Sequence, residues 1–438
     1  MMAETKGKRM MRLLAYIKTG PTVAHFGGWR HPEATLNDIF EPTRYEQMAI
    51  LFEQAKFDGV FFADAFGIAE VFGGTFETYV KNGGQNSWLD PMTVLPLMAR
   101  VTTRLGLGAT ISTTFNNAFQ VARALASLDM LSKGRAAWNV VTSSTDMEAK
   151  NAGLTEIYPH DERYERADEF LEACMALWHT WEPDAFVLDK ESGLFADPAK
   201  VRYADYQGKW IASRGPLPTP PSPQGHPVIM QAGGSPRGRA FGARWAEMIF
   251  APGSDKETML AYTTDMRRRI AEEGRDPDAC KFLMGITPIL GETYSIAQER
   301  AEFLDSLQEK ESDLAYASMG AGADLGKHKT VEEVVAARGN QGIYGSTDVS
   351  RIKAEKEGVT LAESYAKGQT AKAQIGTPAM VADILQDYFE SGACDGFILR
   401  PMTMPTSYEQ FCRMVVPELQ KRGLFRTEYE AATLRGRL

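Results

Sequence analysis

The sequence is poor in the residues that mark metal-binding, disulfide-linked and nucleic-acid-binding proteins. It has 4 cysteines in 438 residues, and their wide spacing fits neither a zinc motif nor a disulfide framework. Lys and Arg number 48 against 57 Asp and Glu, which disfavours nucleic acid and anionic membrane as partners. No apolar run reaches the roughly eighteen residues of a membrane span, and no signal-peptide region follows residues 1–11. We therefore expect a cytoplasmic protein with reduced thiols.

What the sequence does contain is an alternation of short apolar runs and amphipathic helical segments. The apolar spacing switches between a period of two and one of 3.6, which is typical of a parallel sheet with crossover helices. Eight such runs favour a closed (β/α)8 TIM barrel over an open doubly wound α/β sheet. The predicted strands are residues 13–17, 59–64, 105–113, 136–141, 227–231, 246–251, 282–290 and 396–400.

We expect a single barrel domain over residues 1–438 with two insertions. Residues 182–226 are rich in proline near their end, residues 315–374 are rich in glycine, and neither continues the alternation. Long excursions in compact enzymes often form lids or binding loops. The second segment is therefore either a mobile cover over the barrel mouth or a solvated surface insertion.

Polar residues at the carboxyl ends of barrel strands are the first candidates for chemistry. Asp64 directly follows an apolar run, and Thr110 and Asn139 lie near the ends of the next two predicted strands. Taken alone, Asp64 fits a turn or a helix cap as well as a ligand site. Three successive polar strand ends at one rim, with hydroxyls able to bond a heteroaromatic ring, indicate a binding site.

The strongest local signal is the passage from a strand into a helix at residues 231–238. Gly233 and Gly234 allow close backbone approach, Ser235 suits the helix cap, and Pro236 suits the first helical position. A helix start of this kind presents unpaired N–H groups to a phosphate. An ordinary capped helix is the alternative. Because Arg237 replaces the last glycine of a G-x-S-x-G motif, a nucleophilic serine is disfavoured.

Two aromatic side chains open the predicted helix after Pro159. His160 and Tyr164 are four residues apart, so both lie on one helix face and can reach one ligand. The alternative is a capping histidine with Tyr164 in the core. We expect no metal site, because no second histidine stands at zinc-ligand spacing and His25 and His31 are six apart on a predicted loop.

Six motifs follow one another in a fixed order along the chain. They are residues 27–32 (Gly-Gly-Trp-Arg-His-Pro), 61–64 (Phe-Phe-Ala-Asp), 126–129 (Ala-Ser-Leu-Asp), 134–143 (Gly-Arg-Ala-Ala-Trp-Asn-Val-Val-Thr-Ser), 164–170 (Tyr-Glu-Arg-Ala-Asp-Glu-Phe) and 222–235, which start with Ser-Pro-Gln-Gly. Together they resemble those of the bacterial-luciferase-like flavin monooxygenases, in the branch of nitrilotriacetate monooxygenase component A, dibenzothiophene sulfone monooxygenase and long-chain alkane monooxygenase. The resemblance covers about residues 12–425.

The resemblance implies a cofactor, a co-substrate and a partner. Members of this branch bind reduced FMN from a separate NAD(P)H-dependent flavin reductase. They use dioxygen, through a flavin hydroperoxide, to insert one oxygen atom into a small organic substrate. The resemblance places Asp64 and Thr110 by the isoalloxazine and ribityl groups, and Asn139 in the same pocket. It places His160, Tyr164, Ser235 and the Gly234 backbone at the phosphate. It also implies a homodimer or homotetramer.

The substrate pocket is less clearly marked. We expect it near His25, Trp29, Phe61 and Phe66, with Phe26 and Phe72 as further aromatic candidates, although core packing explains each aromatic side chain singly. His25 and His328 are the candidate catalytic residues, as proton donors or as polar walls. The alternatives to a monooxygenase are a flavin-binding protein without turnover, a deazaflavin-dependent oxidoreductase on the same fold and an unrelated phosphosugar barrel enzyme.

Overall fold

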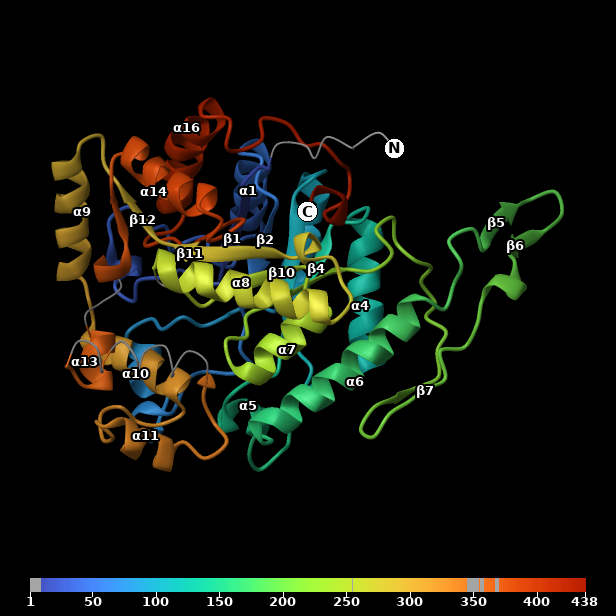
Figure 1. The fold of residues 1–438 in the computed structure, drawn as a ribbon, viewed down its shortest axis with the longest axis horizontal. Coiled ribbons are helices and arrows are strands. Elements are labelled where there is room, and N and C mark those ends of the chain that lie inside the picture. Colours follow the sequence, from blue (N-terminus) through green and yellow to red (C-terminus); the bar gives the residue numbers. More distant parts are fainter. Residues whose placement is uncertain (1–8, 254, 345–353, 355–357, 367–369) are drawn as a thin grey trace.

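The computed structural model describes residues 9–253, 255–344, 354, 358–366 and 370–438. Eight parallel strands form a closed barrel in the order β1-β14-β11-β10-β9-β4-β3-β2, with helices around it (Figure 1). The predicted TIM barrel is confirmed. The barrel strands are β1 (Arg12–Ile17), β2 (Gly59–Phe62), β3 (Gly106–Ser112), β4 (Ala136–Val141), β9 (Val228–Gln231), β10 (Met248–Ala251), β11 (Lys281–Ile286) and β14 (Gly396–Leu399).

Several of the helices begin where the sequence supplies a cap. Asp90, Asn117 and Thr377 each accept a backbone N–H of the first turn that follows them, which satisfies a group that the helix itself leaves unpaired. The helices are α1 (Pro42–Gln54), α2 (Glu77–Lys81), α3 (Pro91–Val101), α4 (Ala118–Leu131), α5 (Asp146–Asn151), α6 (His160–Trp178), α7 (Pro236–Trp245), α8 (Lys256–Glu272), α9 (Tyr294–Ser306), α10 (Lys310–Ala321), α11 (Val331–Ala337), α13 (Leu361–Ala366), α14 (Pro378–Glu390), α15 (Thr406–Gln410) and α16 (Val416–Lys421).

One predicted strand divides in two. Residues 282–290 form β11 in the barrel and then β12 (Pro288–Leu290), which pairs in parallel with β13 (Gln374–Gly376) outside it. The division falls where the partner strand ends, since Ile286 is paired with Leu399, the last residue of β14. Beyond that point the backbone N–H of Thr287 donates to the Gln374 side chain over 2.8 Å.

The barrel interior is filled by side chains rather than open. Alternate residues of the strands point inward and form one apolar cluster. Leu434 of the C-terminal segment closes this cluster at the amino-terminal end of the barrel. Its buried members are Leu14, Phe61, Ala137, Val228, Met230, Met248, Leu283, Ile398 and Leu434. A filled interior is normal for this fold and leaves the strand ends as the place for a ligand.

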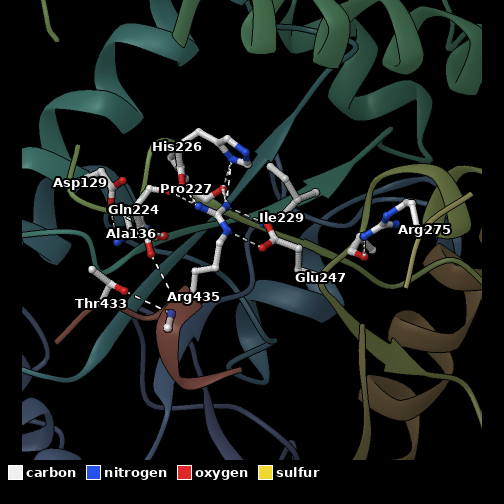
Figure 2. Close-up of polar contacts among 12 residues, drawn as sticks. Asp129, Ala136, Gln224, His226, Pro227, Ile229, Glu247, Arg275, Thr433 and Arg435 are labelled. Carbon is white, nitrogen blue, oxygen red and sulfur yellow. Dashed lines mark hydrogen bonds and ion pairs between the residues drawn. The ribbon is translucent and has the colours of Figure 1, made fainter. Parts of the chain in front are cut away.

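The C-terminal segment closes the amino-terminal end of the barrel through ion pairs. Arg435 Nε lies 2.6 Å from Glu247 Oε2, and its Nη2 lies 3.0 Å from His226 Nδ1 (Figure 2). Arg426 Nη1 lies 2.7 Å from Oδ1 of the buried Asp58. These ion pairs and hydrogen bonds involve Asp58, His226 and Glu247, which all precede barrel strands. The amino-terminal end of the barrel therefore contributes to stability rather than to ligand binding.

The two excursions differ in position. Residues 182–226 carry the hairpins β5 (Phe186–Asp189) with β6 (Leu194–Ala196) and β7 (Tyr206–Gln207) with β8 (Ala212–Ser213). The first hairpin projects away from the barrel, at the right of Figure 1.

Residues 315–374 include the end of α10, α11 and α13, near the mouth of the barrel. Residues 345–353, 355–357 and 367–369 of that segment lie outside the described residues, so its mobility stays a prediction. No helix in the described ranges is long and apolar enough to span a membrane.

Candidate active site

Four neighbouring strands place the predicted cofactor residues along one side of the barrel mouth. β2, β3, β4 and β9 are consecutive in the ring. Asp64 follows β2, Thr110 and Asn139 belong to β3 and β4, and Ser235 follows β9. Thr110 and Asn139 are paired in register, and Asn139 Nδ2 donates to Thr110 Oγ1 over 2.9 Å. The structure therefore brings these predicted site residues together on one arc of the rim.

The start of α7 joins three of the predicted residues in one small cluster. Ser235 is the N-cap, and its Oγ accepts the Gly238 N–H over 3.0 Å. His160 Nε2 lies 3.3 Å from the same oxygen. The rings of His160 and Tyr164 are 5.2 Å apart at their centroids. The helical spacing of these two residues brings both rings to the capped helix start, and their role at a phosphate, which the family resemblance implies, stays a prediction.

Glycine keeps this cluster open. A Cβ at Gly238 would lie 2.8 Å from Tyr164 Oη, closer than real Cβ atoms approach, and 3.0 Å from Ser235 Oγ, which is tighter than most real contacts. The first turn of a helix also leaves N–H groups that its own carbonyls cannot satisfy. The helix start, two hydroxyls and an imidazole therefore form a cradle of hydrogen-bonding groups that suits a phosphate.

The protonation states in the cradle follow from burial. Burial lowers the pKa of His160, while the hydrogen bond to Asp161 opposes that shift. Burial raises the pKa of Tyr164, so its hydroxyl stays protonated and able to donate. Behind them the buried Arg163 donates to the Ser143 carbonyl over 2.5 Å, while its Nε has no partner among the described residues.

The second excursion covers the cradle. The Tyr344 ring stacks on His160 with 4.6 Å between centroids and 5° between planes. The backbone N–H of Gly342 donates to the Ser144 carbonyl over 2.8 Å, and the Gln341 side chain accepts from Asp146 N over 3.0 Å. These contacts place residues 341–344 over the barrel mouth.

A cavity that opens to solvent lies beside this arc, at the ends of β1 and β2, with about 500 Å³ of empty space including its open mouth. Its lining comes from these strands, from the loop that follows α2, and from α10. Burial raises the pKa of Asp64, whose Oδ1 accepts the Ala65 N–H over 2.9 Å. The lining residues are Tyr16, Lys18, Ala63, Asp64, Ala65, Gly67, Ala69, Tyr79, Gln85, Asn86, Tyr316 and Met319.

The predicted aromatic substrate residues are dispersed. Phe61 lies in the barrel interior, edge-on to Tyr16 at 5.2 Å. Trp29 donates through Nε1 to the Asn82 carbonyl over 3.1 Å. Phe66 is 46% exposed and stacks on Phe115. The described cavity lining includes none of the three predicted residues, so their role in substrate binding stays a prediction.

Two further aromatic candidates lie against the excursion. Phe26 packs on the cavity residues Tyr79 and Tyr316, with 5.4 Å between the Phe26 and Tyr316 centroids. Phe72 belongs to the same cluster. Both therefore support the wall of the cavity.

The two candidate catalytic histidines lie apart from the described cavity lining. His25 is buried, its Nδ1 accepts the Gly27 N–H over 3.1 Å, and its Nε2 has no partner in the described ranges. Burial lowers its pKa to about 4. His328 is half-buried between α10 and α11, where its backbone N–H donates to the Asp324 carbonyl. A proton-donor role for either stays a prediction.

Sequence reasoning missed Lys18, Tyr16, Tyr79, Tyr316 and the amides at positions 85 and 86. Lys18 had a usable signal, because it directly follows the apolar run that forms β1. The same strand-end reasoning that selected Asp64 selects it as well. Tyr79 and Tyr316 carry no such signal, since their place depends on how α2 and α10 pack over the barrel. In the described part of the chain, no group of three or more His, Cys, Asp or Glu could hold a metal ion.

Comparison with known proteins agrees with this geometry. The family model of luciferase-like monooxygenases matches residues 22–395. Dibenzothiophene-sulfone monooxygenase of Rhodococcus erythropolis (strain XP) is 42% identical, over 98% of this chain and 97% of that protein. Long-chain alkane monooxygenase of Geobacillus thermodenitrificans (strain NG80-2) is 39% identical, over 95% and 91%.

A solved structure extends the comparison to a flavin complex. Riboflavin lyase, crystallised with modified FMN and riboflavin, superposes with a TM-score of 0.89 at 33% identity, over 98% of this chain and 95% of that one. The predicted family and enzyme class are confirmed, and the chain belongs to the luciferase-like monooxygenases.

Proposed function

We propose that this monooxygenase binds reduced FMN across the barrel mouth and uses dioxygen to insert one oxygen atom into a small organic substrate. One observation carries the proposal. The cradle at the start of α7 and the polar strand ends of β2, β3 and β4 lie on one continuous arc. A phosphate in the cradle would let the ribityl chain and ring extend along that arc.

The residues of the arc divide the work of holding the cofactor. Ser235, His160 and Tyr164 would bind the phosphate, with the Gly234 backbone beside them. Asn139 and Thr110, which are hydrogen-bonded to each other, would face the ribityl chain. Asp64 would lie beside the ring, within reach of a hydrogen bond to its polar edge, and burial raises the pKa of this carboxyl group. Bound reduced FMN supplies the chemistry with dioxygen, so the protein needs neither a nucleophile nor a metal.

The remaining task of the chain is to exclude water from the reacting centre. Tyr316 of α10 lines the cavity, and Tyr344 covers His160. Both belong to the second excursion, which we propose acts as the cover. Closing an active site in this way prevents loss of a reactive intermediate to solvent.

We further propose a separate NAD(P)H-dependent flavin reductase as the electron supplier, and a homodimer or homotetramer in the cytoplasm. The reductase and the oligomeric state come from the family resemblance. Mixing the chain with such a reductase and following product formation tests the first, and light scattering tests the second.

The cradle is tested by Ser235→Ala. A hydrogen bond to a charged oxygen contributes about 1.5–3 kcal/mol, so we expect reduced FMN to bind roughly ten- to a hundredfold more weakly. Anaerobic titration measures the dissociation constant. Ser213→Ala, in the short strand β8 of the first excursion, is a matched control that should leave it unchanged. Equal affinity in Ser235→Ala and the parent would remove the cradle from the proposal.

Turnover is tested separately with labelled dioxygen. Incorporation of oxygen-18 into sulfones, thioethers, amino-polycarboxylates, alkanes or halogenated aromatics, with a reductase present, would establish monooxygenation and narrow the substrate. A flavin-binding protein without turnover would release only peroxide. A deazaflavin-dependent enzyme would retain a different reduced cofactor.

A further inference from the structure

The cavity beside the proposed flavin site contains a lysine that cofactor binding does not use. Lys18 directly follows β1, is 6% exposed and lines the cavity. It forms no ion pair or hydrogen bond with the described residues. Burial lowers its pKa, while Tyr316, Asp64 and Glu148 oppose that shift. Burying an unpaired ammonium group lowers the stability of the folded protein. A bound anion would offset this loss, so the position of Lys18 points to a ligand.

Other donors in the cavity are equally unsatisfied. Gln85 and Asn86 are 5% and 6% exposed and both line the cavity. Within the described ranges, the side-chain nitrogen of each amide has no hydrogen-bond partner. Burial raises the pKa of Tyr16 and of Tyr316, so both hydroxyls remain protonated donors.

Acceptors are few by comparison. Asp64 is the one carboxylate among the described lining residues, and one of its oxygens already accepts the Ala65 N–H. A second cation stands on the neighbouring strand. Arg400 directly follows β14, its guanidinium lies 5.8 Å from the centre of the Tyr16 ring, and it forms no ion pair with any described residue. Among the described residues, the lining therefore holds one cation and one carboxylate, with Arg400 as a further cation outside the lining, and its unpaired side-chain nitrogens are donors.

The rest of the wall is apolar or aromatic. Tyr79 and Tyr316 contribute aromatic rings, Met319 contributes a flexible thioether, and Ala63 and Ala65 contribute methyl groups. A cavity of this composition binds the hydrophobic body of a small molecule and fixes its orientation through a few polar groups.

We propose that Lys18 binds the carboxylate, sulfinate or sulfonate group of an aromatic or apolar substrate. This inference names the substrate class of the monooxygenase and so rests on the proposed function. Arg400 adds attraction for the same charge at the rim, and the amides of Gln85 and Asn86 supply hydrogen bonds to its oxygens. The apolar body then lies toward the flavin arc.

Binding of defined probes tests the proposal without knowledge of the natural substrate. The FMN-loaded protein is titrated calorimetrically with naphthalene-2-carboxylate and naphthalene-2-sulfonate, and with the neutral naphthalene-2-carboxamide. We expect the anions to bind about tenfold more tightly than the amide, a preference of the size that one charge pair provides in a buried site. Equal affinities, or no anion binding at millimolar concentration, would overturn the proposal.

The assignment to Lys18 is tested by two variants. Lys18→Met should bring the anions to within about twofold of the amide, whereas Lys18→Arg should keep most of the preference because the charge remains. Lys421→Met, whose parent side chain is 82% exposed on α16, serves as the control and should keep the full preference. An unchanged preference in Lys18→Met would refute the role of Lys18.

Folding and cofactor binding are measured on the same variants. Lys18→Met exchanges a buried unpaired charge for an apolar side chain of similar length, so it should melt no lower than the parent. Its dissociation constant for reduced FMN should equal that of the parent. A weakened FMN affinity with an intact anion preference would assign Lys18 to the flavin instead. If the parent binds no FMN, the proposed function fails, while the anion preference of the flavin-free protein still tests the cavity.

Discussion

At the scale of single residues, the cradle depends on one absent methyl group. Gly238 lies in the first turn of α7, where alanine would favour the helix by about 1 kcal/mol. The added Cβ would crowd Tyr164 Oη and Ser235 Oγ. We therefore expect Gly238→Ala to weaken reduced FMN binding at least fivefold, with a melting temperature close to that of the parent. Fluorescence titration and thermal denaturation measure the two effects.

A matched exchange separates the cradle from helix propensity. Gly320 lies in α10, and a Cβ there would meet no atom within 4 Å. Gly320→Ala should leave the FMN affinity unchanged. Comparable losses of affinity in both variants would show that the position of Gly238 has no special importance.

The position of a residue could be predicted from the sequence where the backbone alone determines it, while the role of these residues in the site stays a prediction. Asp64, Thr110, Asn139 and Ser235 stand at strand ends, and parallel strands in a barrel carry their ends to one rim. His328 and Trp29 could not be placed in this way, because excursions and loops fix them through long-range packing. The unpaired state of Lys18 is likewise invisible in a sequence, since it depends on which carboxylates the fold brings near.

At the scale of elements, the C-terminal segment is joined to the barrel by buried charges. Asp58 is fully buried and pairs with Arg426, whose side chain is 3% exposed. Arg426→Ala leaves that carboxylate without its nearest cation, so we expect the free energy of unfolding to fall by about 3 kcal/mol. Urea denaturation measures it.

An exposed pair provides the comparison. Arg413, 69% exposed, faces Glu409 at 3.6 Å, and Arg413→Ala should change stability by less than about 0.5 kcal/mol. Similar losses in the two variants would mean that the C-terminal segment contributes little to the stability of the barrel.

Strands and helices could be predicted wherever burial makes apolar residues recur at a regular spacing along the sequence. All eight barrel strands coincide with predicted apolar runs. The separation of β12 from β11 could not be predicted, because the apolar run continues while the partner strand ends. The hairpin of β5 and β6 also escaped notice, since most of its side chains are exposed and no core-facing alternation marks it.

At the scale of the whole molecule, buried histidines make stability depend on pH. Burial lowers the pKa of His25 to about 4, with a smaller lowering from His31 and an opposing influence of Asp305. The unfolded imidazole takes up its proton near pH 6.5, so acidification between pH 6.5 and 4 favours the unfolded chain. His226, lowered to about 4 by burial and Arg435, acts in the same direction.

One buried carboxyl opposes the histidines. Burial raises the pKa of Asp129 to about 6. The folded protein therefore loses stability as the pH rises toward 6, because this carboxyl ionises more readily in the unfolded chain. The contribution of His25 is therefore best isolated by His25→Gln. We expect the variant to lose about 2 kcal/mol less than the parent between pH 7 and 4.5, measured by urea denaturation at each pH. His328→Gln, at a half-buried position, is the comparison, and parallel pH curves for His25→Gln and the parent would contradict the assignment.

The order of strands around the ring has a consequence for how this scaffold acquires new specificities. The strand-end groups proposed to bind the flavin belong to or follow β2, β3, β4 and β9, whereas Lys18 and Arg400 directly follow β1 and β14, which are adjacent to each other. Under the proposal for Lys18, we expect exchanges at those two positions to shift the preference of the enzyme from charged to neutral compounds without changing the residues proposed to bind the flavin. A small library at positions 18 and 400 is thus a direct route to retargeting this catalyst.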